Sequence, residues 1–196
     1  EMISEYYSPA VSKAINGPAI PEFEENDKVT VPPEGFQVIE ELVFPKYDKE
    51  HKKELLQELG ILSANLARLE KVSKSNQLTD AHVFDAMRLE VYRIITLGIT
   101  GFDSPILQSS ILETGQSLIS IPKTLEKINT DNKSLSELRE LTKKAQQYCT
   151  ENNNFNAFDR AFFITEYLNP ISKKIKTLST DFVQYKHLDF LSKDIE

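Results

Sequence analysis

The most informative hydrophobic pattern runs from Phe84 to Pro105, where apolar residues recur at steps of three and four. This spacing is that of one stripe of an α-helix. The stripe consists of Phe84, Met87, Val91, Ile94, Ile95 and Gly98, and further apolar residues cover much of the opposite side. A helix that is apolar nearly all round must be wrapped by other helices. The pattern therefore predicts a central, mostly buried helix that ends in a polar turn.

A second periodic segment begins after Asp48 and extends to about Ser73. Its predicted core positions are Leu55, Leu59, Leu62, Leu66 and Leu69. Its polar face carries Lys52, Lys53, Glu54, Glu58, Arg68 and Glu70, so the segment is typical of an amphipathic bundle helix. Farther along the chain, Asp103 or Ser104 followed by Pro105 predicts a helix start, because a capping residue precedes a proline at the first helical position.

Taken together, these patterns predict an all-α fold, an up-and-down antiparallel bundle of seven or eight helices. The connections are short, which favours antiparallel neighbours. A proline-containing loop over residues 17–33 precedes a short apolar helix from Gly35 to Phe44. We expect residues 1–196 to form a single helical-bundle domain, and we leave open that it is a fragment of a larger multidomain protein.

Composition narrows the functional classes. The chain has 196 residues with a formal net charge of -7, and its basic residues form no clustered face of the kind that nucleic-acid binding needs. We interpret the run Lys173, Lys174 and Lys176 as a solvated helix face. Transmembrane helices require about 20 apolar residues, and the longest apolar run is far shorter. We therefore expect neither a nucleic-acid partner nor a transmembrane span.

Catalytic and cofactor motifs are absent from the sequence. Cys149 is the single cysteine, so the chain has no CxxCH motif for attachment of a c-type haem and no internal disulfide. The three histidines, His51, His82 and His187, have no regular spacing. Nucleophile elbows, zinc-peptidase helices and phosphate-binding loops are also missing.

Gln37 and Glu40 form the first candidate site. Their spacing of three residues places them on one side of the short helix. A carboxylate three residues after a coordinating side chain is a common metal-site geometry in helical bundles, so this pair is a candidate metal site. The alternative is that Gln37 and Glu40 form hydrogen bonds with Arg88 or Arg93 of the central helix.

A buried polar cluster of Arg88, Glu90, Arg93 and Asp103 is the second candidate. Buried charges are costly unless they are paired. Arg93 lies about one helical turn beyond Glu90, so we expect a buried ion pair between Arg93 and either Glu90 or Glu40. Such a cluster either determines helix register or forms a polar pocket for a ligand.

The segment PEGFQVIEELVF, from Pro33 to Phe44, resembles the GxHxxE signature of imelysin-like proteins, which are exported, all-helical proteins of iron acquisition. Gly35 and Glu40 match the signature, whereas Gln37 occupies the histidine position. The resemblance implies that Glu40 is a metal ligand, with iron or another divalent metal as the cofactor. It also admits a metallopeptidase, which we rank last because no general base can be assigned.

A closer resemblance includes EYYSPAVSKAINGPAIP, from Glu5 to Pro21, and RIITLGITGFDSP, from Arg93 to Pro105. With the imelysin-like segment, they are similar to the N-terminal helical domain that precedes di-haem cytochrome c peroxidase modules in bacteria. This resemblance implies a non-catalytic accessory domain of a periplasmic redox protein. Its partner would be a haem-containing peroxidase module, in cis or in trans, and c-type haem would occur only in that module. The alternative is a free-standing imelysin-type protein that binds iron or another metal.

Overall fold

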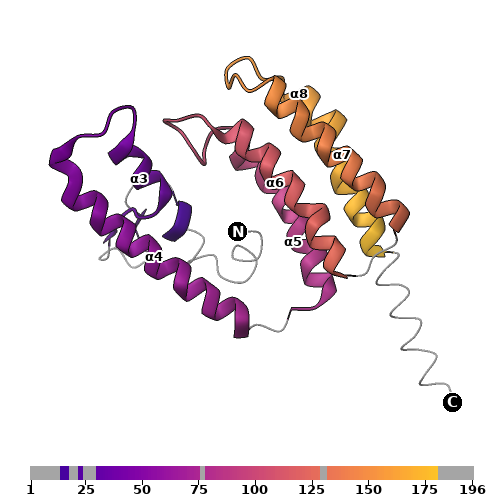
Figure 1. The fold of residues 1–196 in the computed structure, drawn as a ribbon, viewed down its shortest axis with the longest axis horizontal. Coiled ribbons are helices and arrows are strands. Elements are labelled where there is room, and N and C mark those ends of the chain that lie inside the picture. The colour runs from indigo at the N-terminus through magenta and orange to yellow at the C-terminus, as the bar shows by residue number, and fades with distance from the viewer. Residues whose placement is uncertain (1–13, 18–21, 24–29, 76–77, 129–131, 181–196) are drawn as a thin grey trace. The chain divides into compact units, whose positions relative to one another are not determined.

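The computed structural model describes residues 14–17, 22–23, 30–75, 78–128 and 132–180, and these residues are mainly helical (Figure 1). Most of the segment from Glu5 to Pro21 lies outside the described residues, as does His187. The chain divides into two compact units, which are described separately below. Unit 1 comprises Glu1–Gln77 and Thr100–Ser109, and unit 2 comprises Leu78–Ile99 and Ser110–Glu196. That residues 1–196 act as a single domain stays a prediction.

The described part of unit 1 is built mainly on two helices and a very short strand pair. Its elements are β1 (Glu22–Phe23), β2 (Thr30–Val31), α3 (Phe36–Val43), the 3₁₀ turn η1 (Lys49–His51) and α4 (Lys52–Ser75). The strands are antiparallel, with Glu22 opposite Val31, and they lie in the segment that we expected to be a loop. The short apolar helix is confirmed as α3, which packs against α4.

The core of unit 1 uses only part of the apolar surface of α4. Leu62 is buried beside Ile15, and Ile39 and Leu69 pack against them. Leu59 and Leu66, which we expected in the core stripe, are instead 44% and 43% exposed. The leucines of α4 cover a wide arc of the helix, and the residues packed against α4 bury only one side of that arc. The predicted stripe is therefore wrong at these two positions.

Unit 2 contains the remaining helices. They are α5 (Asp80–Arg93), which continues as the π-helical segment η2 (Ile94–Gly98), α6 (Ser110–Leu125), the 3₁₀ turn η3 (Glu126–Ile128), α7 (Asn132–Glu151) and α8 (Arg160–Phe163), which continues as the π-helical segment η4 (Ile164–Leu168). Helix α6 packs along α7, η2 packs on α6, and η4 packs on α7 (Figure 1). Fully buried side chains at the centre include Phe84, Leu118, Leu138 and Phe163.

The central helix is confirmed on one face and corrected on the other. Phe84, Met87 and Val91 are at most 1% exposed, as the stripe predicts. Tyr92 on the opposite side is 64% exposed, so the helix is not wrapped all round. The helix starts after Thr79, whose side chain caps the first turn in a reciprocal arrangement with His82.

One helix boundary differs from the expected one, and one proline lies inside a helix. Residues 103–107 form turns, and α6 begins only at Ser110, because the Ser104 carbonyl accepts a hydrogen bond from the Gln108 backbone and Gln108 has a φ of 55°. Pro170 does not separate two helices, since the chain stays helical from Arg160 through residue 180. The π-helical turn of η4 changes the backbone hydrogen-bond pattern just before Pro170, which lacks an N–H donor.

Candidate functional site

Gly35 positions the N-terminal end of α3. It has a φ of 97° and a ψ of -159°, a region of backbone space that is essentially restricted to glycine. Gly35 also pairs with Asn16 in an isolated β-bridge. A Cβ atom at Gly35 would lie 2.2 Å from the carbonyl oxygen of Ile15. Only glycine therefore permits this close approach between the start of α3 and the 14–16 segment.

Gln37 and Glu40 both bind the backbone of the segment that runs from Thr100 to Ser109. The Gln37 side chain is 3% exposed, and its Nε2 donates to the carbonyl oxygen of Phe102 at 2.8 Å. The backbone N–H of Leu107 donates to Glu40 Oε1 at 2.7 Å. We call Asn16, Gln37 and Glu40 the loop seat, because Asn16 Nδ2 also donates to the Asp103 carboxylate, at 3.2 Å.

The loop seat gives Gln37 and Glu40 partners that differ from the arginines expected from the sequence. We considered hydrogen bonds with Arg88 or Arg93, but the bonds that both side chains make in the described structure lead to loop backbone. Asp103 lies in unit 1, where its carboxylate accepts a hydrogen bond from Asn16 of the loop seat. Arg88 itself is exposed, so the expectation that it joins a buried polar cluster is wrong. On α5 it lies one helical turn after Phe84, at the edge of the buried stripe.

Three polar oxygens around the loop seat are buried without a hydrogen-bond partner among the described residues. They are Glu40 Oε2, Asn16 Oδ1 and Ser104 Oγ. Buried polar atoms normally have a partner, so these oxygens have capacity for a water molecule or a cation. Oxygen donors of this type suit hard cations better than softer transition metals. Within the described ranges, no cluster of three or more His, Cys, Asp or Glu side chains is arranged to hold a metal.

The expected buried ion pair is confirmed in unit 2, between Arg93 and Glu90. Glu90 is 2% exposed, and its Oε2 lies 3.4 Å from Arg93 Nε. The sequence reasoning missed Ser117 of α6, whose Oγ donates to Glu90 Oε1 at 2.5 Å. Both carboxylate oxygens of Glu90 are therefore bonded, which is the usual condition for a charge inside a helical core.

Arg160 is a second residue that the sequence reasoning missed. Its guanidinium group donates to three backbone carbonyl oxygens, those of Ile99 at 2.7 Å, Phe155 at 2.9 Å and Phe158 at 3.3 Å. The same group lies 4.5 Å from the centre of the Phe155 ring. Arg160 thus joins the loop before α8 to the C-terminal end of η2, where helix carbonyls lack intrahelical partners. The signal in the sequence that could have indicated this region is its density of aromatic residues from Phe155 to Tyr167.

Cys149 lies fully buried in α7, next to an aromatic cluster. The neighbouring Tyr148 ring contacts the rings of Phe158, Phe162, Phe163 and Tyr167. Burial raises the pKa of the Cys149 thiol from 9.0 to about 12. A thiol that stays protonated at neutral pH is a poor nucleophile and a poor metal ligand. Cys149 is therefore a packing residue.

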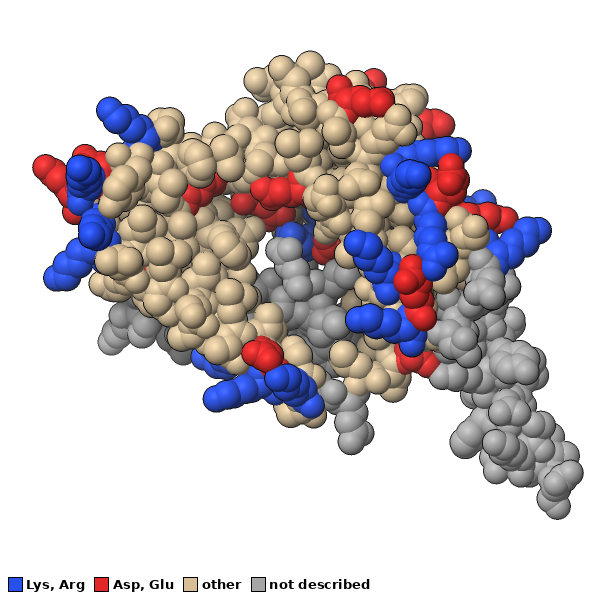
Figure 2. All heavy atoms as spheres, in the orientation of Figure 1, with Lys and Arg blue, Asp and Glu red and all other residues tan. Residues whose placement is uncertain are grey.

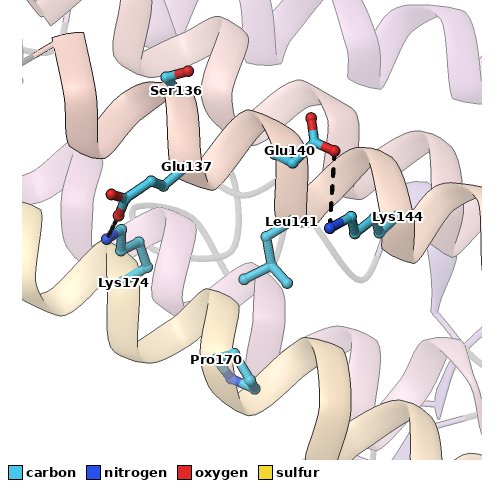
Figure 3. Close-up of a pocket in the computed structure, with 7 residues that line it drawn as sticks. All are labelled: Ser136, Glu137, Glu140, Leu141, Lys144, Pro170 and Lys174. Carbon is cyan, nitrogen blue, oxygen red and sulfur yellow. Dashed lines mark hydrogen bonds and ion pairs between the residues drawn. The ribbon is translucent and has the colours of Figure 1, made fainter.

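A shallow groove of about 600 Å³ lies between α7 and the helical residues after η4 (Figure 3). It is lined by Ser136, Glu137, Glu140, Leu141, Lys144, Pro170 and Lys174. Lys174 pairs with Glu137, and Lys144 Nζ lies 3.9 Å from Glu140 Oε1. Lys174 therefore contributes to a helix face of ion pairs, and such exposed pairs contribute little to stability.

Comparisons of this chain with protein-family models, curated proteins and solved structures found no match. None of the described helices has both the length and the hydropathy that crossing a membrane requires.

Proposed function

We propose that this chain is a non-catalytic accessory helical domain of an exported, periplasmic cytochrome c peroxidase-like redox protein. In this proposal it docks onto the haem-containing peroxidase module, which carries the c-type haem. The resemblance of the Gly35–Glu40 segment to imelysin-like proteins, and of the longer segments to the peroxidase-associated domain, supports this assignment.

The observation that carries the proposal is the way the loop seat presents the 100–109 segment. Gln37 and Glu40 bind backbone groups of Phe102 and Leu107. The side chains of Phe102, Ile106 and Leu107 are 44%, 40% and 48% exposed. Three large apolar side chains on one short, anchored segment are typical of a surface that binds another protein. The residues of the GxHxxE-like motif thus support a docking loop in place of a reactive centre.

Two measurements test this function. The reading frame that encodes the chain, or a neighbouring gene, should contain two CxxCH motifs. The chain should bind the encoded haem module in biolayer interferometry, and Ile106→Asp should weaken binding by roughly tenfold or more, because it places a charge in the apolar contact. The matched control is Leu112→Asp, at a leucine of unit 2 that is 44% exposed. If no such module is encoded, or if both variants bind like the wild type, the proposal is wrong.

A second candidate function is metal binding of the imelysin type, and the unpartnered oxygens of Glu40, Asn16 and Ser104 favour it. Calorimetric titration with Fe²⁺ or with Mn²⁺, which carboxylate oxygens prefer, should then give heat of binding in the wild type and not in Glu40→Ala. Glu41→Ala is the control, because Glu41 is adjacent and exposed. A wild type without heat of binding for either metal removes this candidate.

A further inference from the structure

Helix α4 carries a second apolar face that the core of unit 1 does not cover. Leu56, Leu59 and Leu66 are 59%, 44% and 43% exposed. With Ser63 they follow steps of three, four and three residues, which is the spacing of a seam between two packed helices. Glu58 is the only charged residue from Leu56 to Ala67, and it lies half-buried on the side of α4 that faces Leu62.

Small residues near the centre of this face would allow a second helix to approach closely. Gly60 and Ala67 lie beside the leucines on the helix surface, and Ser63 interrupts them. A Cβ atom added at Gly60 would meet nothing within 4 Å. Small residues between large ones let the backbone of a second helix come near, so that its leucines fill the spaces.

Charges at the two ends of α4 indicate what the second helix is. Lys52 and Glu70 are each nine residues from Ile61, in opposite directions, and both point to the same side as the exposed leucines. Both are exposed. Figure 2 shows charged side chains gathered over the two ends of α4, with an uncharged stretch between them. An antiparallel copy of α4 centred on Ile61 would place Lys52 opposite Glu70 of the second copy, and would do so twice.

We propose that the Leu56–Leu66 face of α4 is a self-association surface, on which two copies of this chain pair through antiparallel α4 helices. A two-fold interface requires one patch to complement itself. Here Leu56 meets Leu66 of the second copy, and Leu59 meets the small Ser63. This surface lies on α4 and shares no residue with the proposed docking loop. Each proposal can therefore be refuted without affecting the other.

The size of the face sets the expected strength. Stable interfaces bury about 1,200–2,000 Å² in total, and a single helix face of about three turns provides less. We therefore expect a weak dimer with a Kd on the order of 100 µM. Sedimentation equilibrium of the full chain from about 10 µM to about 1 mM is the suitable measurement. A wild type that is monomeric throughout this range overturns the proposal.

Variants locate the interface. Leu59→Lys should raise the dimer Kd by roughly tenfold or more, because it inserts a charge into the seam. Leu112→Lys is the matched control, since Leu112 of α6 is equally exposed, and it should dimerise like the wild type. Circular dichroism melting checks that both variants remain folded. Equal dimerisation of the two variants contradicts an α4 interface.

A charge-reversal cycle tests the antiparallel register. Lys52→Glu and Glu70→Lys should each raise the dimer Kd by about two- to fivefold, as expected for exposed pairs that become repulsive. The double variant restores opposite charges and should return the Kd towards the wild-type value. A double variant that dimerises no better than either single variant refutes this register. The cycle also corrects for charge effects within one helix, where Glu70 pairs with Lys74.

Discussion

Replacing Gly35 by alanine should strongly destabilise unit 1. In the structure Gly35 has a φ of 97°, and holding an L-residue in this region costs about 1–3 kcal/mol. The new Cβ atom would also lie 2.2 Å from the Ile15 carbonyl oxygen. An ordinary van der Waals contact is roughly 3.5 Å, so the 14–16 segment and α3 must move apart by about 1 Å. Relieving such a clash typically costs about 1–3 kcal/mol.

The two contributions predict a total loss of about 2–6 kcal/mol in the free energy of unfolding for Gly35→Ala. Gly60→Ala is the matched control. It lies in the middle of α4 with open space around the added Cβ, so alanine should stabilise the helix by about 0.5–1 kcal/mol. The same substitution should therefore change stability in opposite directions at two glycines of one unit.

Native-state hydrogen exchange is the appropriate assay, because the chain has two compact units and a single global transition is not assured. The informative amide in unit 1 is that of Ile39, which donates to the Gly35 carbonyl at 3.1 Å. Amides of α7 report on unit 2 and should be unchanged. Equal protection of the Ile39 amide in Gly35→Ala and in the wild type would show that α3 does not begin against the 14–16 segment, which refutes the reasoning.

Three further predictions concern residues of unit 2, and the first two are compared with a substitution at an exposed residue. Arg93→Leu should lower the free energy of unfolding by roughly 3–5 kcal/mol, because it leaves the buried Glu90 without its cation. Lys53→Leu, at an exposed position, should change the free energy of unfolding little. Equal midpoints of the two variants in urea denaturation contradict this prediction. Arg160→Ala should lower the free energy of unfolding by about 2–4 kcal/mol, because three hydrogen bonds to backbone carbonyls are lost. Arg139→Ala should lower it by at most about 1 kcal/mol, because the ion pair of Arg139 with Glu126 is half-exposed. Thermal melting of the two variants compares these effects. Because the folded-state pKa of Cys149 lies above its ordinary value, the protonated thiol contributes stability below pH 9 that is lost as the pH rises from 9 towards 12. Cys149 should also resist a thiol reagent at pH 8 until urea unfolds the chain. Rapid labelling of Cys149 in the native protein argues against its burial.

The periodic patterns predicted much of the helical framework, because burial of a stripe at steps of three and four residues is a local property of the chain. The buried face of Phe84, Met87 and Val91 follows directly from it. The Arg93–Glu90 pair was also predictable, since one helical turn separates the two residues. Proline and glycine placed the ends of α3 correctly for the same local reason.

Tertiary structure alone decided the use of the remaining surface. Leu59 and Leu66 have the spacing of core residues, but whether they are buried depends on how many elements pack against α4. Gln37 and Glu40 bind residues more than sixty positions away, and Ser117 and Arg160 likewise complete contacts that are distant in sequence. Hydrophobic periodicity specifies which face of a helix is apolar, because it arises from the geometry of one helix. It does not specify the partner of that face or of a polar side chain, because that depends on how separate segments meet in space.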